Sequence, residues 1–312
     1  MSSVKQSRPS VNPSRPSSVR RLTPALVAWC SVFLVVIVIV GLVAIKVTSG
    51  GGPTATSHQA VRPASGALVR ELSTVPDSVF NVVGVGIPSQ FVGGSPIVIS
   101  GQPPLTLNGG SPSMMYFGAE YCPFCAAERW GMVVALARFG TWRGLDTTAS
   151  GLMDGDFSTL SFRDAKLTSR YINFVPVESC TNIVDPKTAG CSGYRPLQRP
   201  SGSEQSVLDK YAGPAFIPGN TQGISFPYID VDNRVLFSGS TYDPAVLTGL
   251  SQEQIAAGLT DPANMVTQSI VGTSNYIAAS ICASTRGAPA DVCDSSGVQK
   301  ADAALRIDSA HG

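Results

Sequence analysis

Two cysteines separated by two residues constrain the fold of this chain more than any other feature. They are Cys122 and Cys125 in the segment Tyr121-Cys122-Pro123-Phe124-Cys125, which follows an apolar run at 114–117 typical of a buried strand. Pro123 suits the first position of a helix. A cysteine at a helix start lies near unpaired backbone N–H groups and the positive end of the helix dipole, which favour the thiolate. The motif predicts a strand, a tight turn and a helix that begins at a reactive cysteine.

The amino end predicts a membrane anchor. Residues 1–24 are rich in Ser, Pro, Arg and Lys without an acidic residue, which predicts a disordered cytoplasmic tail. Residues 25–47 carry a single charge, Lys46, and would span roughly 35 Å as a helix, enough to cross a bilayer. Because basic residues precede this span, the positive-inside rule places the rest of the chain outside. A cleaved signal peptide is the alternative, which the length of the apolar run disfavours.

The remaining chain is expected to lie outside the cytoplasmic membrane as a single-pass protein. Residues 48–75, rich in Gly, Ser, Thr and Pro, predict a flexible tether, and residues 76–312 predict the extracytoplasmic domain. Charged residues make up 14% of the chain and the net charge is +1. Because the basic cluster belongs to the tail, nothing predicts a nucleic-acid surface.

Cysteine usage agrees with an exported domain. One of the seven cysteines, Cys30, falls in the predicted span, and six remain outside in three sequence-close pairs. An even number in an exported domain favours disulfides. Two of them are expected to be structural, Cys180–Cys191 and Cys282–Cys293, each contributing about 3 kcal/mol. This local pairing is one of several connectivities, and free buried thiols are the alternative.

The residue pattern indicates an α/β domain. Strands are predicted at 114–118, 144–148, 159–163 and 172–177, and helices at 123–139, 203–211 and 264–284. Two apolar strands flank Asp232-Asn233 and predict a hairpin just after Phe226-Pro227. Ser251 and Gln254 match a capping box, which begins a helical carboxyl-terminal extension at about 251–312. Residues 79–107 are expected to form short strands and turns.

The order of these elements resembles the thioredoxin superfamily over roughly residues 110–250. The resemblance implies that Cys122 is the nucleophile, Cys125 the resolving cysteine and Pro227 a cis-proline facing both. It also implies that Tyr121 and Phe226 contribute to substrate binding.

A closer resemblance lies in residues 117–130 and 135–140. These are similar to an uncharacterised prokaryotic family called domain of unknown function 929, which is membrane-anchored and thioredoxin-like. The similarity implies a thioredoxin-like α/β fold with an amino-terminal transmembrane helix, an insertion between the active-site helix and the hairpin, and the helical extension. It implies little about activity, and the long insertion leaves the substrate and partner undefined.

The motif also has other interpretations. Zinc needs four ligands, and the chain has no second Cys-x-x-Cys and only two histidines, His58 and His311, so no metal or cofactor is expected. A purely structural disulfide remains an alternative. Glu120 and Glu128 flank the motif; they are expected to be solvated surface carboxylates, with proton transfer to a buried cysteine as the alternative. The apolar stripe around Trp130 is expected to be core.

These observations predict a membrane-anchored, extracytoplasmic thiol–disulfide oxidoreductase, with oxidase or isomerase activity favoured over reductase activity. Its substrates would be protein thiols or disulfides, and a membrane redox partner could recycle the motif. The competing prediction is a non-enzymatic scaffold or interaction subunit of a membrane complex, which the long additions around the core would suit.

Overall fold

The computed structural model describes residues 60–86, 95–110, 112–188, 190–221 and 223–306. The predicted tail, the predicted membrane span at 25–47 and His58 lie outside the described residues. Within these ranges, no helix is both long enough and apolar enough to cross a membrane.

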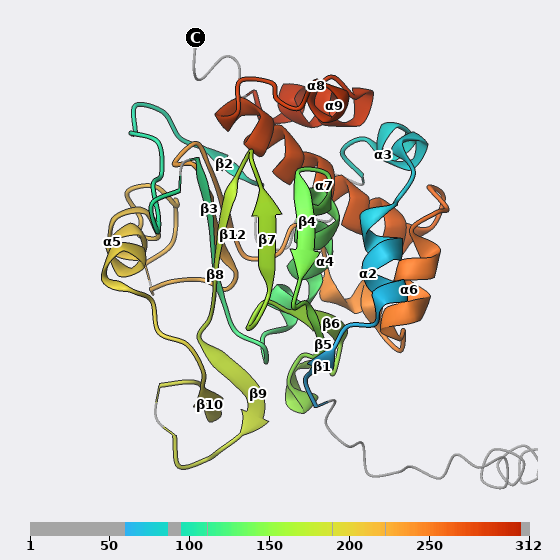
Figure 1. Cartoon of the computed structure of the whole chain (residues 1–312). Coiled ribbons are helices and arrows are strands. Elements are labelled where there is room, and N and C mark those ends of the chain that lie inside the picture. The colour runs from blue at the N-terminus through green and yellow to red at the C-terminus, as the bar shows by residue number, and fades with distance from the viewer. Residues whose placement is uncertain (1–59, 87–94, 111, 189, 222, 307–312) are drawn as a thin grey trace, which may run out of the picture. The chain divides into compact units, whose positions relative to one another are not determined.

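A five-stranded sheet forms the centre of the domain (Figure 1). In spatial order its strands are β2 (Ile97–Val98), β12 (Val235–Ser238), β11 (Tyr228–Val231), β3 (Ser113–Gly118) and β8 (Asn173–Glu178). β3 and β8 are parallel, whereas β11 pairs antiparallel with both β3 and β12. A parallel pair needs a crossover connection, and the chain between β3 and β8 includes a long helix and four short strands. The predicted α/β class is confirmed.

Both faces of the central sheet are covered. Successive strand residues point to opposite faces, so on β3 Met114 and Tyr116 join one apolar core, while Met115 and Phe117 join another. The second core is closed by α5 (Gly202–Tyr211). The first core is closed by a larger group of helices, which lies on the opposite side of the sheet from α5 in Figure 1.

Two long helices dominate the larger group, α4 (Pro123–Ala137) and α7 (Met265–Ser284). They approach closely at Gly131, where an added Cβ would lie 2.7 Å from Cβ of Thr273. Trp130 is fully buried here, as predicted. Shorter helices surround this pair: α2 (Gly66–Ser73), α3 (Asp77–Val83), α6 (Gln252–Gly258), α8 (Ala290–Cys293) and α9 (Ser296–Leu305).

Small sheets and single turns complete the described chain. One sheet joins β1 (Arg62–Pro63), β5 (Asp146–Ala149) and β6 (Ser158–Ser161), and another joins β4 (Gly140–Arg143) and β7 (Lys166–Ser169). The hairpin of β9 (Cys180–Val184) and β10 (Tyr194–Pro196) continues from the end of β8. The 3-10 helices are η2 (Leu152–Asp154) and η3 (Pro244–Leu247).

Local signals in the sequence place several of these elements correctly. Ser251 and Gln254 form the predicted capping box of α6, and Asn264 caps α7 through its side chain. Asp232 and Asn233 both adopt positive φ and turn the β11–β12 hairpin. Each of these positions needs a short polar side chain that satisfies backbone groups or tolerates a left-handed conformation, so the residue type alone marks the boundary.

Two predictions about the amino-terminal part of the domain are wrong. The predicted tether includes residues 66–73, but these residues form α2 and bury Leu68 and Leu72 in the main core. Residues 77–83, predicted partly as short strands, form α3. In α2 the apolar positions follow helical spacing, and Ser65 caps the first turn. The prediction failed because the Gly, Ser and Pro residues around this short helix give the segment the composition of a linker.

Candidate functional site

Cys122 caps the helix that carries the motif. It precedes α4 with extended backbone angles, and its Sγ accepts a hydrogen bond of 3.3 Å from the backbone N–H of Cys125. Pro123 occupies the first turn, where its missing N–H costs nothing. The sulfur therefore replaces the oxygen of an ordinary N-cap and lies where a negative charge is stabilised.

The two cysteines are free thiols with different surroundings. The side chain of Cys125 is fully buried, and Cys122 is buried apart from 5% of its surface. A side-chain hydrogen bond from Cys125 is the largest influence on Cys122 and lowers its pKa, although burial opposes this effect. Burial is the largest influence on Cys125 and raises its pKa well above the ordinary value. Of the two, Cys122 is therefore the thiol that ionises first.

Tyr116 and Gly118 line the inner side of Cys125. The Tyr116 hydroxyl forms a side-chain hydrogen bond with Cys125 and also lies 3.5 Å from Oε2 of Glu178. At Gly118 an added Cβ would lie 2.8 Å from Cys125 Sγ and would also overlap the Tyr116 hydroxyl. Gly118 therefore lets the tyrosine hydroxyl and the buried thiol approach each other beside the β3 backbone.

A fully buried ion pair lies behind the motif. Arg129, one helical turn beyond Cys125, donates from Nε to Oε1 of Glu178 at 2.9 Å and from Nη2 to Oε2 at 2.8 Å. Its Nη2 also donates to the backbone oxygen of Ala119, two residues before Tyr121. Both side chains have no exposed surface. The pair ties α4 to the end of β8 and holds the loop that leads into Cys122.

The two acidic residues that flank the motif are buried, so their prediction as solvated surface carboxylates is wrong. Glu120 accepts from Ser161 at 2.7 Å and pairs with Arg163 at 2.8 Å. Glu128 accepts from the backbone and side chain of Thr241, both at 2.9 Å. Burial is the largest influence on Glu128 and raises its pKa to about 7. Each carboxylate points into a packed interface, Glu128 from α4 and Glu120 from the turn before it.

Phe226 and Pro227 lie beside the motif. The Phe226–Pro227 peptide bond is cis, and Phe226 packs against the cluster that contains both motif cysteines. Tyr228 pairs with Phe117 across β11 and β3, so Pro227 falls at the level of Gly118. A hollow of about 460 Å³ lies alongside, with Phe124, Ile217, Phe226 and Ser238 among residues that carry no charge.

A disulfide joins Cys180 and Cys191 with a Cα–Cα distance of 5.9 Å. It belongs to the same buried cluster as the motif, together with Ala119 and Tyr194. The predicted local pairing of these cysteines is therefore the pairing in the structure. The β9–β10 hairpin that carries the bond is held to the motif loop by the stacking of Tyr121 on Tyr194, with ring centroids 4.4 Å apart.

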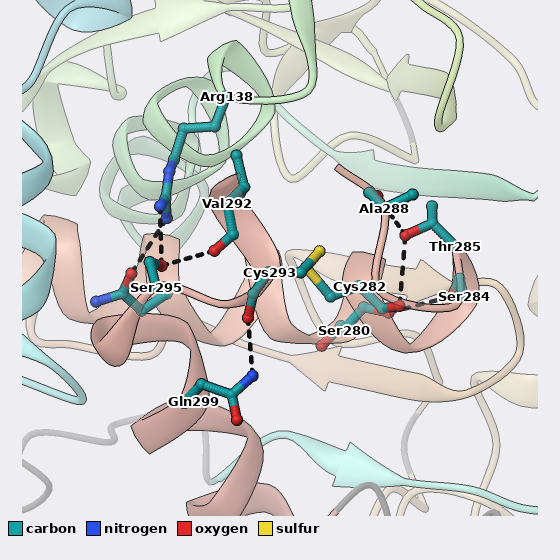
Figure 2. The surroundings of a disulfide bond; sticks show 11 residues. Arg138, Ser280, Cys282, Ser284, Thr285, Ala288, Val292, Cys293, Ser295 and Gln299 are labelled. Atoms are coloured by element: carbon teal, nitrogen blue, oxygen red, sulfur yellow. Dashed lines mark hydrogen bonds between the residues drawn. A yellow bond between two sulfur atoms is a disulfide. The ribbon is translucent and has the colours of Figure 1, made fainter. Parts of the chain in front are cut away.

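The second disulfide, Cys282–Cys293, joins the end of α7 to α8 with a Cα–Cα distance of 5.6 Å, again as predicted (Figure 2). It lies in the main core rather than in the motif cluster. Figure 2 shows Gln299 of α9 donating to the backbone oxygen of Cys293 and Arg138 at the end of α4 reaching Ser295. The disulfide therefore lies among helices that contact the carboxyl end of α4, whereas the motif is at its amino end.

Sequence reasoning missed Arg129, Glu178 and Tyr116. Arg129 lies four residues after Cys125, so helical spacing places both on one face of α4, and this signal was available. Tyr116 is two residues before Gly118 on a strand predicted as buried, where its hydroxyl needed a partner. The position of Glu178 depends on the parallel pairing of β8 with β3, and no local sequence pattern predicts this pairing. Within the described ranges, no group of three or more His, Cys, Asp or Glu side chains could hold a metal ion.

Comparison with known proteins relates part of the chain to a family model. Residues 99–183 match the family model described as Domain of unknown function (DUF929). The matched segment contains β3, the motif, α4, β8 and Cys180, and it supports the resemblance to this family. No curated protein matches the chain. No solved structure matches it either.

Proposed function

We propose that this protein is a thiol–disulfide oxidoreductase that uses Cys122 as its nucleophile and Cys125 as its resolving cysteine. The observation that carries the proposal is the hydrogen bond from the Cys125 backbone N–H to Cys122 Sγ at the start of α4. The thiolate is the reactive species in disulfide exchange, and this position stabilises it.

The arrangement around the motif supports a thioredoxin-like assignment. A buried strand leads into the motif, the motif begins a helix, and a proline precedes an antiparallel hairpin that pairs with the same strand. Phe226 and the adjacent uncharged hollow would bind an extended substrate segment beside Cys122. Hydrogen bonding of such a segment to the backbone at Phe226 is a strand-addition mode.

In the oxidising direction, a substrate thiolate attacks Cys122 Sγ of the Cys122–Cys125 disulfide. A mixed disulfide forms and Cys125 leaves as a thiolate, which takes up a proton. A second substrate thiolate attacks the substrate sulfur of the mixed bond, so that an oxidised substrate and a reduced motif are released. Burial favours the neutral form of Cys125, which makes its return to the thiol favourable.

In the reducing direction, the Cys122 thiolate attacks a substrate disulfide and Cys125 resolves the mixed disulfide. Before resolution Cys125 must lose its proton, and the Tyr116 hydroxyl lies within hydrogen-bonding reach of its sulfur. The raised pKa of Cys125 disfavours this step at neutral pH, so the surroundings of the motif agree with the oxidase or isomerase direction.

The proposed location is the outer side of the cytoplasmic membrane, with residues 25–47 as a single-pass anchor and residues 1–24 in the cytoplasm. An oxidising compartment agrees with the two additional disulfides of the folded domain. Protein thiols or disulfides would be the substrates there, and a membrane redox partner would recycle the motif.

A non-enzymatic scaffold is the second candidate. It is favoured by the large helical addition, because α6, α7, α8 and α9 extend the domain well beyond the motif and the central sheet. In that case the two motif cysteines would serve only stability, and Cys122 would react like an ordinary free cysteine.

Trapping of mixed disulfides separates the two candidates. A full-length Cys125→Ser variant expressed in its native membrane should accumulate Cys122-linked adducts with other proteins, visible without reductant and lost with it. The matched control is Cys122→Ser, which keeps one motif thiol but should trap nothing. Equal adduct levels in both variants, or a Cys122 that stays a free thiol in Cys125→Ser, would contradict the oxidoreductase.

A further inference from the structure

The Cys180–Cys191 disulfide is part of the motif's immediate surroundings rather than of the main core. Six buried residues form this cluster apart from the two larger cores: Ala119, Cys122, Cys125, Cys180, Cys191 and Tyr194. Four of the six are cysteines, two free and two bonded. A dithiol and a disulfide therefore share one apolar cluster.

Backbone pairing brings Cys180 close to the motif loop. Beyond the parallel pairing of β3 and β8, the ladder continues through a bond of 2.7 Å from Ser179 N–H to Gly118 and one of 2.9 Å from Glu120 N–H to Cys180. Strands paired in this way lie about 4.8 Å apart. Cys122 follows Glu120 by two residues, so the two sulfur-bearing segments are direct neighbours.

The Cys191 side of the disulfide contacts the residue that precedes Cys122. Tyr121 stacks on Tyr194 and its hydroxyl lies 3.4 Å from Oγ of Ser192. The Tyr194 hydroxyl donates to the Asp154 carboxylate. Asp154 lies three residues after Gly151, whose backbone N–H donates to the backbone oxygen of Tyr121. These contacts hold the β9–β10 hairpin over the motif loop, and both hairpin cysteines are nearly fully buried there.

We infer that Cys180–Cys191 is a second redox-active disulfide, which exchanges with the Cys122–Cys125 dithiol within one chain. This inference rests on the proposed function, because it uses Cys122 as the nucleophile. The site would then store a second oxidising disulfide. Because the hairpin cysteines are buried, a substrate would exchange with this disulfide only through the motif.

The exchange balances without another reagent. The Cys122 thiolate attacks one sulfur of the Cys180–Cys191 bond, a Cys122 mixed disulfide forms, and the other hairpin cysteine leaves as a thiolate. Cys125, after losing its proton, attacks Cys122 Sγ and displaces the attacked hairpin cysteine. Two electrons pass from the motif to the hairpin pair, and the protons lost by Cys122 and Cys125 are replaced on Cys180 and Cys191.

Cys282–Cys293 provides an internal control. It closes a loop of the same sequence separation, 11 residues, with nearly the same Cα–Cα distance. It lies in the main core, and Figure 1 places α8 at the opposite end of the view from β9 and β10. The control therefore matches the hairpin disulfide in sequence separation and in Cα–Cα distance but lies outside the cluster that contains Cys122.

The first test measures how fast each disulfide is reduced. The full chain, carrying Cys30→Ser to remove the remaining cysteine, is oxidised in detergent and treated with dithiothreitol, and free thiols are alkylated and mapped over time. Reduction of Cys180–Cys191 should be about tenfold slower or more in a Cys122→Ser variant, since the relay is lost, while Cys282–Cys293 reacts equally in both. Equal rates for Cys180–Cys191 in both proteins would overturn the inference.

The second test traps the intermediate. In Cys125→Ser, peptide mapping without reductant should find Cys122 bonded to Cys180 or Cys191 and never to Cys282 or Cys293. Cys122 bonded to glutathione after incubation with oxidised glutathione, with Cys180–Cys191 intact, would reject the relay and leave the proposed function standing. Cys122 that forms neither bond would reject both.

Discussion

Arg129 and Glu178 form a two-point ion pair that has no exposed surface and lies directly behind Cys125. Removing one partner of such a pair leaves a buried charge without compensation. Arg129→Gln should therefore lower the free energy of unfolding by about 3–5 kcal/mol, measured by denaturant titration of the reduced protein.

The matched control is Arg195→Gln. Arg195 pairs with Asp185 at 3.6 Å but is more than half exposed, so its loss should cost about 1 kcal/mol or less. Equal losses in the two variants would contradict the structural role assigned to the buried pair.

Cys125 should set the acidity of Cys122 through its hydrogen bond. Cys125→Ser keeps a hydroxyl donor, whereas Cys125→Ala removes it, so the pKa of Cys122 should be higher in the alanine variant. The pH dependence of Cys122 alkylation, with the disulfides intact, reports this value directly. Identical profiles in the two variants would show that the side-chain bond has no influence.

Glu128 should make the stability of the domain depend on pH. Its folded-state pKa of about 7 lies above its ordinary value of 4.5, so between these values the folded state holds a proton that the unfolded state has lost. The free energy of unfolding should therefore fall as pH rises through this window, by about 3 kcal/mol, and become level above it. In Glu128→Gln this contribution should disappear.

The measurement is the difference in free energy of unfolding between wild type and Glu128→Gln at several pH values. A constant difference between wild type and Glu128→Gln from pH 4.5 to 7 would contradict the burial assigned to this carboxyl.

Gly118→Ala should damage the site without a change in charge. The added methyl group would lie 2.8 Å from Cys125 Sγ and would overlap the Tyr116 hydroxyl, so one of them must move. We expect a loss of about 1–3 kcal/mol in stability and slower disulfide exchange. Gly202→Ala, where the new methyl group meets nothing within 4 Å, should lower neither quantity.

The sequence predicts those parts of the fold that depend on local chemistry. The Cys122 cap, the α6 capping box and the turn at Asp232-Asn233 each require a particular residue type at a particular position, so short patterns were sufficient. The pairing of Cys180 with Cys191 followed from their short separation and the even number of exported cysteines.

The rest of the site depends on contacts between distant segments. Glu178 reaches Arg129 only because β8 lies parallel to β3, and Glu128 meets Thr241 across 113 residues of sequence. A carboxylate has the same local sequence pattern whether it faces solvent or a distant segment of the chain. Burial of Glu120 and Glu128 was therefore decided by tertiary packing, which the local sequence does not encode.

The central claim is that Cys122 performs the exchange chemistry, and the rate of oxidation of a model dithiol by the oxidised full-length protein tests it most directly. Wild type should oxidise the dithiol rapidly, and Cys122→Ser, with Cys180–Cys191 and Cys282–Cys293 confirmed intact, should lose this activity. Disulfide exchange by Cys122→Ser at the wild-type rate would contradict the role of Cys122 as nucleophile and leave the motif with a structural role alone.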